Sequence, residues 1–188
     1  MKQVIAFELH QFLENESFQL VCQDIFMEFE IEFINQNVGV LQLKMNQMNL
    51  LSTMKSHFEA NGIGLSAVIG YQQDALLLQA LQYAKVVAAN EITYLADIIL
   101  LETNNQSNEL LMELHKKLTR ISHDNVISAK AFLESGCNAL LASESLYVHR
   151  NTFSYRMTKF MDQSNMDLRD FHCARLFQLW LTLKKTLK

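Results

Sequence analysis

The stretch NALLASESLYVHRNTFSYRMTKF, residues 138–160, decides how the C-terminal part of this chain folds. Its apolar residues recur at helical spacing in two segments, and Val148 fills the corner of the short turn between them. In the first segment, the small residues Ala142 and Ser143 let a second helix cross closely. We expect this segment to bury three leucines, which are Leu140, Leu141 and Leu146. The pattern predicts two short helices packed across each other.

The second helical segment has a single apolar stripe. Phe153, Met157 and Phe160 are spaced i, i+4 and i+7, so all three should face inward. Arg can bridge guanine O6 and N7, Asn can bridge adenine N6 and N7, and hydroxyls and cations can hold phosphates. A helix behind a tight turn and a crossing helix suits a major groove, which predicts a helix-turn-helix at about 138–163. The residues left facing outward are Arg150, Asn151, Ser154, Tyr155, Thr158 and Lys159.

The residues alone leave alternatives open for this stretch. Many helical hairpins have small residues at the crossing and a few surface cations, so an ordinary amphipathic pair remains an alternative. His149 could contact DNA or only close the turn, and Tyr155 could lie on a sugar-phosphate or pack against the neighbouring helix. Lys159 suits a phosphate better than a base edge. The strongest candidates for DNA contacts are Arg150, Asn151 and Arg156.

The N-terminal half alternates strand-like and helix-like patterns. VIAFELH (4–10) is mostly apolar, as in a strand buried on both faces, while EFEIEF (28–33) alternates strictly. VGVLQLKM (38–45) returns after the turn INQN as the second strand of a hairpin. With a last strand at ITYLADI (92–98), the order is β-α-β-β-α-β-α-β. This predicts an α+β domain, with one largely antiparallel sheet and helices packed on it.

The charge distribution suggests two domains with different partners. Residues 1–111 hold 4 Lys and Arg against 13 Asp and Glu, a charge of −9, whereas residues 112–188 hold 12 against 7, a charge of +5. The basic C-terminal part is the candidate for a polyanion such as DNA. We expect the α+β domain at 1–98, a polar linker at 99–108 and an all-α domain at 109–188. The expected helices of the last domain are about 108–122, 124–135, 138–146, 149–163 and 168–186.

Cysteine usage and hydropathy predict a cytoplasmic location. Cys22, Cys137 and Cys173 are odd in number and widely spaced, which argues against a disulfide framework and a structural zinc. The N-terminus is a poor signal peptide and the longest apolar run is too short to span a bilayer, so no membrane partner is expected. No cofactor and no metal site are expected, because His115 and His123 have no third ligand beside them.

The segment from about Ala129 to Leu183 resembles the C-terminal helix-turn-helix domain of PucR-type (CdaR-like) bacterial transcriptional regulators. AFLESGCNALLASESLYVHRNTFSYRM (131–157) and MDLRDFHCARLFQLWLTL (166–183) carry the resemblance. It implies a sequence-specific transcriptional regulator that binds double-stranded DNA as a homodimer. Its N-terminal domain would serve dimerisation or the response to an unknown small-molecule effector. The DNA-binding residues implied are His149, Arg150, Asn151, Thr152, Ser154, Tyr155, Arg156, Thr158 and Lys159.

The N-terminal half is similar to the degenerate GGDEF-like domain that precedes this helix-turn-helix domain in the same family. GIGLSAVIGYQQDALLLQALQYAKVVAA (62–89) carries the similarity, which implies a nucleotide-cyclase or ferredoxin-like fold. Cyclase activity needs carboxylates that gather two Mg²⁺ ions, and the hairpin turn INQN has none. We therefore expect no enzyme activity and no catalytic residue. The alternatives are a protein-interaction regulator that has lost DNA binding, favoured by Ser154 and Thr158 where relatives have arginines, and a nucleotide-binding cyclase relic.

Overall fold

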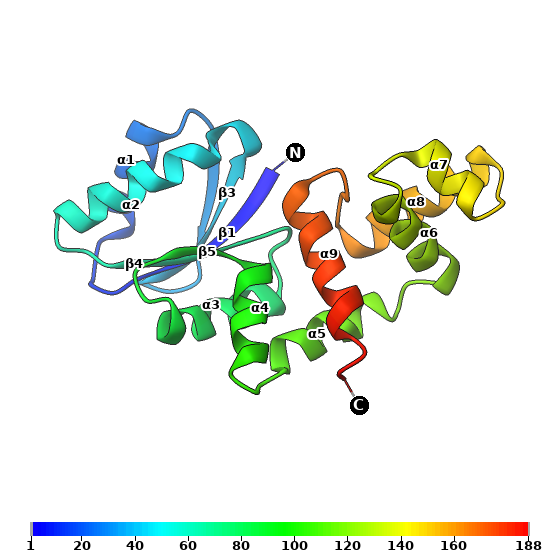
Figure 1. Cartoon of the computed structure of the whole chain (residues 1–188). Helices are drawn as coiled ribbons and strands as arrows, with labels where there is room; N and C mark the ends of the chain where they lie inside the picture. The colour runs from blue at the N-terminus through cyan, green and yellow to red at the C-terminus, as the bar shows by residue number, and fades with distance from the viewer. Residues whose placement is uncertain (1, 188) are drawn as a thin grey trace. The chain divides into compact units, whose positions relative to one another are not determined.

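The computed structural model describes residues 2–187, which form two compact units divided between Asn105 and Gln106 (Figure 1). Each unit has its own buried core, and each is described here by itself. Within residues 2–187, no helix has the length and apolar character needed to cross a membrane.

A five-stranded sheet in the order β2-β3-β1-β4-β5 organises the N-terminal unit. The central strand β1 pairs antiparallel with β3 and β4, β2 pairs antiparallel with β3, and β4 pairs parallel with β5. Three of the four pairings are antiparallel, which confirms the predicted largely antiparallel sheet. The strands are β1 (Lys2–Leu9), β2 (Phe29–Phe33), β3 (Val38–Lys44), β4 (Leu65–Gly70) and β5 (Ile92–Tyr94).

Helices cover both faces of this sheet, with α1 and α2 on one face and α3 and α4 on the other (Figure 1). The core beneath α1 and α2 is aromatic: the Phe7 ring stacks on Phe18 at 4.5 Å between centroids, and Phe18 stacks on Phe58 at 5.2 Å. Side chains from β1, α1 and α2 therefore meet in one stack, which suits offset aromatic packing. The helices are α1 (Asn15–Ile25), the 3-10 helix η1 (Met45–Leu50), α2 (Leu51–Ala60), α3 (Ala75–Val87) and α4 (Leu95–Asn104).

The end of the N-terminal unit differs from the sequence-based prediction. Strand β5 stops at Tyr94, and residues 95–104, expected as the end of a strand and the start of a linker, form helix α4. Short apolar runs such as ADIILL fit a strand and a buried helix equally well. Here the run continues at helical spacing, because the buried residues are Leu95, Ala96, Ile98, Ile99 and Glu102. The predicted linker over 99–104 is therefore wrong.

The C-terminal unit is entirely helical, as predicted. Its core joins α8 to α9: the Phe160 ring meets Phe177 edge-on at 4.9 Å, and Phe177 stacks on Trp180 at 5.6 Å. Polar side chains cap four of its helices by accepting backbone N–H groups, namely Ser122, Asn138, His149 and Asp170. The helices are α5 (Glu109–Leu118), α6 (His123–Glu134), α7 (Ala139–Ser145), α8 (Arg150–Ser164) and α9 (Phe171–Leu183).

The three cysteines should react very differently with alkylating reagents. Cys22 and Cys173 are buried, and burial raises the pKa of each thiol to about 12, whereas Cys137 is exposed. Because the thiolate is the reactive form, we expect iodoacetamide at pH 8 to modify one cysteine per native chain and all three after unfolding in urea. Intact-mass measurement after brief labelling checks this. Rapid labelling of Cys173 in the native protein would contradict the packing of α9.

Candidate nucleic-acid interface

Helix α7 is short and buries its smallest residues. The Asn138 side chain caps it by accepting the N–H groups of Leu140 at 3.0 Å and Leu141 at 3.2 Å, and Ala142 and Ser143 are buried. The expectation that the leucines are buried is wrong: Leu140 is 59% exposed, Leu141 is 52% exposed and Leu146 is half-buried. A close crossing leaves room only for small side chains, so the neighbouring leucines fall outside the inward face of α7.

A tight turn joins α7 to α8. Tyr147 adopts a left-handed backbone with φ of 53°, its N–H donates to Glu144 O at 3.0 Å, and the Val148 N–H donates to Ser143 O at 3.1 Å. These bonds satisfy carbonyls at the end of α7 and stop the helix there. The Tyr147 side chain is 97% exposed, so it contributes nothing to the core of the turn. The backbone fixes the angle at which α8 leaves α7.

His149 closes the turn by capping α8. Its Nδ1 accepts the Asn151 backbone N–H at 3.2 Å, so this nitrogen acts as the acceptor. In a neutral imidazole the proton then lies on Nε2. Of the two roles open to His149 from sequence, the structure gives it the turn-closing one. The remaining Nε2–H is a donor that a phosphate could accept.

Helix α8 has the inward stripe that the sequence predicted. Phe153, Met157 and Phe160 are all buried, and Ser164 extends the stripe by one turn. At about 100° per residue, these four positions lie within a narrow sector of the helix. The opposite side is free of core contacts and therefore forms a polar surface. Its exposed residues are Arg150, Asn151, Thr152, Ser154, Tyr155, Thr158, Lys159, Asp162 and Gln163.

Arg156 differs from the other candidate contacts because a carboxylate already holds it. Its Nη2 lies 2.5 Å from Asp124 Oδ2 in the first turn of α6, and its side chain is 23% exposed. Nearby, Asn125 Nδ2 donates to Gln163 Oε1 at 3.4 Å, which ties α6 to α8 a second time. The structure thus places Arg150 and Asn151 at the exposed start of α8 and Arg156 on its flank. Sequence gave no sign of the Asp124 pair, since the partners are 32 residues apart.

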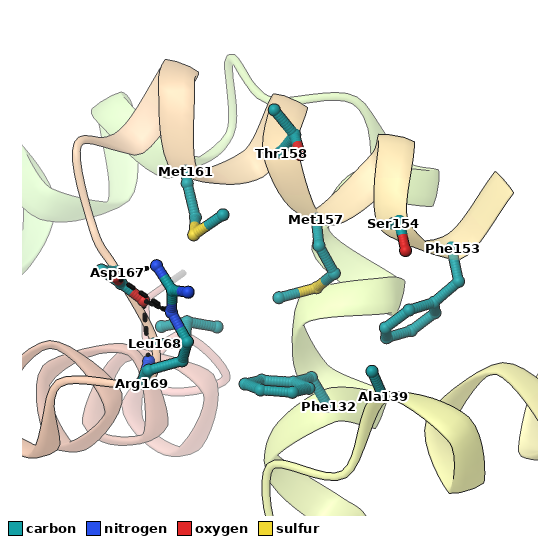
Figure 2. Close-up of a pocket in the computed structure, with 10 residues that line it drawn as sticks. All are labelled: Phe132, Ala139, Phe153, Ser154, Met157, Thr158, Met161, Asp167, Leu168 and Arg169. Atoms are coloured by element: carbon teal, nitrogen blue, oxygen red, sulfur yellow. Dashed lines mark hydrogen bonds and ion pairs between the residues drawn. The ribbon is translucent and has the colours of Figure 1, made fainter. Parts of the chain in front are cut away.

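A hollow of about 210 Å³ lies beside α8, and sequence reasoning did not find it. Figure 2 shows Met157 and Met161 pointing into it from α8, with Asp167 and Arg169 on one side and Ala139 on the other. Its walls are mostly apolar, and its polar members come from α8 and from the loop before α9. The residues that line it are Phe132, Ala139, Phe153, Ser154, Met157, Thr158, Met161, Asp167, Leu168 and Arg169.

Arg169 is oriented at the hollow by Asp167. Its Nε donates to Asp167 Oδ1 at 2.8 Å and its Nη2 donates to Oδ2 at 2.5 Å, which is a fork-like pairing. The hydrogen bond from Arg169 lowers the pKa of Asp167, and Asp167 in turn raises the pKa of Arg169. Both groups are therefore charged at neutral pH. The short motif MDLRD was the signal in the sequence, since its carboxylate and guanidinium stand two residues apart.

The hairpin turn of the N-terminal unit holds amides rather than carboxylates. Asn35 Oδ1 accepts the N–H groups of Asn37 at 2.9 Å and Val38 at 2.8 Å, which fixes the turn. The Leu9 N–H donates to Asn37 O at 2.8 Å, so the end of β1 lies beside this turn. Within the described chain, no group of three or more His, Cys, Asp or Glu residues could hold a metal ion.

Comparison with known proteins gives matches to a helix-turn-helix domain family and to two Bacillus subtilis proteins. Residues 127–184 match the family described as the PucR C-terminal helix-turn-helix domain. YxkF of Bacillus subtilis, an uncharacterized protein, is 32% identical over 79 residues, covering 42% of this chain and 27% of YxkF. The proline-responsive transcriptional activator PutR of B. subtilis is 25% identical, covering 81% of this chain and 45% of PutR.

A likeness to one solved structure spans the whole chain. A regulator of polyketide synthase expression from Bifidobacterium adolescentis shares 15% identity with a TM-score of 0.48, covering 100% of this chain and 82% of that one. The chain spans less than half the length of the two B. subtilis relatives. The family match covers α7, the turn and α8, where the structure places the exposed polar helix surface. The segment 127–184 is thus similar to the PucR C-terminal helix-turn-helix domain.

Proposed function

We propose that this protein is a transcriptional regulator that binds duplex DNA with α8 in the major groove. The observation that carries the proposal is the exposed polar surface of α8 behind a fixed turn, within a PucR helix-turn-helix domain. Arg150 and Asn151 lie in the first turn of α8. In a helix-turn-helix, the N-terminal residues of the recognition helix contact the base edges. Lys159 lies two turns further on and suits a phosphate. Because chromosomal DNA is the ligand, the proposal includes a cytoplasmic location.

A homodimer on a palindromic site forms part of the proposal. One recognition helix reads only a few base pairs, and two-fold proteins reach useful specificity by binding two half-sites one helical turn apart. The N-terminal unit, as a degenerate GGDEF-like domain, would serve dimerisation or the response to an effector, without enzyme activity. The amide-bearing turn at Asn35–Asn37 supports the absence of a cyclase role, since amides cannot replace the carboxylates that gather Mg²⁺.

Salt-dependent binding to random duplex DNA tests this proposal. We expect the affinity to fall steeply between low and moderate salt, because phosphate contacts release counterions. Arg150→Ala with Lys159→Ala should weaken binding at least about tenfold, and the lost phosphate contact of Lys159 should reduce the slope of log K against log salt by roughly 0.9. Arg156→Ala should weaken binding less, because Asp124 already holds that guanidinium. Fluorescence anisotropy of a labelled duplex measures the affinity of the wild type, of the double variant and of Arg156→Ala.

The matched control removes the same charge from another helix of the unit. Lys116→Ala with Arg120→Ala changes two exposed cations at the end of α5. If this double variant loses as much affinity as Arg150→Ala with Lys159→Ala, net charge and not the α8 surface drives binding. A wild-type protein that stays unbound at low salt would rule out autonomous DNA binding by this chain.

A protein-interaction role is the second candidate, and the exposed apolar residues of the helix-turn-helix favour it. Leu140, Leu141 and Tyr147 are each more than half exposed on or beside α7. Apolar side chains grouped on a surface often mark a protein contact. This candidate predicts partner binding that ignores salt, survives Arg150→Ala and is lost in Leu140→Ser with Leu141→Ser.

A further inference from the structure

We infer that the hollow beside α8 binds the DNA sugar-phosphate backbone, and that Arg169 holds a phosphate there. This inference rests on the proposed function and adds a contact that lies outside the recognition helix. It assigns an occupant to a cavity of about 210 Å³ whose lining includes Ser154 and Thr158 from α8. It also gives a role to the loop that joins α8 to α9.

The hollow lies next to the proposed DNA-reading surface. Ser154 and Thr158 are one helical turn apart on α8, so they share one stripe. At about 100° per residue, this stripe lies between the buried one and the outward one that carries Asn151 and Tyr155. Both Ser154 and Thr158 are exposed and both line the hollow. A backbone flanking a groove that α8 occupies would therefore pass along the mouth of the hollow.

Arg169 keeps donors free for an anion even though it pairs with Asp167. The pair uses the Nε and Nη2 edge of the guanidinium. A guanidinium has five N–H donors, so the two on Nη1 and one on Nη2 remain. The side chain is 71% exposed, and Asp167 limits the orientations of its fork. A guanidinium oriented in this way suits the two oxygens of a phosphate.

The walls of the hollow suit the sugar that joins neighbouring phosphates. Met157, Met161 and Leu168 give a flexible apolar surface, against which the carbon face of a deoxyribose can pack. The hydroxyls of Ser154 and Thr158 are neutral donors on the α8 side. A guanidinium paired with the Asp167 carboxylate on one side, hydroxyls on another and an apolar floor match the mixed chemistry of a sugar-phosphate. No base edge is needed, so this contact carries no sequence preference.

Arg169→Gln in the full chain tests the inference by anisotropy on a random duplex across a salt series. We expect the affinity to fall about 3- to 10-fold, and the salt slope to drop by roughly 0.9, the value for one phosphate. The loss of affinity should be the same for every DNA sequence. The matched control, Arg120→Gln, removes one exposed guanidinium of the same unit that does not line the hollow, and should change affinity less than about twofold.

A second variant separates a direct contact from an indirect one. Arg169→Gln leaves the Asp167 carboxylate without its partner, and that charge could repel DNA by itself. In Asp167→Asn with Arg169→Gln the carboxylate is gone, so a direct guanidinium–phosphate contact predicts that the loss persists. Full recovery of affinity in the double variant would overturn the inference, and so would equal affinities for Arg169→Gln and Arg120→Gln. In either case wild-type DNA binding would still stand, whereas absence of wild-type binding would remove the proposed function itself.

Discussion

Phe160→Ala is expected to lower the free energy of unfolding of the C-terminal unit by about 3–5 kcal/mol. The Phe160 side chain is fully buried on the inward stripe of α8, and its ring meets Phe177 of α9 at 4.9 Å. Removing the ring loses its burial and leaves a cavity between two helices that cannot collapse fully. Urea unfolding followed by the fluorescence of Trp180 measures the change, because this single tryptophan stacks on Phe177 in the same core.

Phe171→Ala is the matched control for this change. Phe171 is also an aromatic residue at a helix of the C-terminal unit, but it is 70% exposed. Its removal should change the free energy of unfolding by no more than about 0.5 kcal/mol. A loss of under 1 kcal/mol for Phe160→Ala would show that α8 does not depend on its inward stripe. Burial of that stripe would then no longer explain why the polar side of α8 faces outward.

The fold of the C-terminal unit was largely predictable because its signals are local. Three apolar residues at i, i+4 and i+7 define the buried side of α8, and the small pair Ala142 and Ser143 marks the helix crossing. Local periodicity cannot say how wide the inward face of a short helix is, which is why Leu140 and Leu141 were assigned to the core. The crossing distance, a tertiary property, decides that question.

In the N-terminal unit, the hairpin was predictable because strict alternation at 28–33 fits only a strand with one buried face. The run ADIILL was not, because continuous apolar residues suit a buried strand and a buried helix alike. Its neighbours settle the matter in the structure: β4 offers β5 only a short parallel pairing, of Ala67, Val68 and Ile69 with residues 92–94. The chain then turns into α4.

The candidate site was predictable in part. Which side of α8 is polar follows from spacing alone, and so does the exposure of Arg150 and Asn151. The pairing of Arg156 with Asp124 depends on how α6 crosses α8, and the hollow at Arg169 depends on the path of the loop before α9. Both features join residues that only tertiary packing brings together.

Asn151→Ala is expected to relax base preference at one position of each half-site by about 5- to 150-fold, or 1–3 kcal/mol. Asn151 is exposed in the first turn of α8, where a side-chain amide can donate to adenine N7 and accept from adenine N6. His149 accepts only the backbone N–H of Asn151, so alanine keeps the helix cap and the loss is confined to the side chain. Selection from a random duplex pool by wild type and variant, at one fixed salt concentration, measures the preference.

Lys159→Ala provides the contrast that identifies a base-reading residue. Because Lys159 is proposed to contact a phosphate, Lys159→Ala should lower the affinity equally for the selected site and for every single-base variant of it. The salt slope should fall by about 0.9. Asn151→Ala should leave the salt slope unchanged and weaken only the sites that carry adenine at the position it reads. A uniform loss in Asn151→Ala would make it another backbone contact. The specificity of this helix would then have to come from Arg150, the one exposed guanidinium at the start of α8.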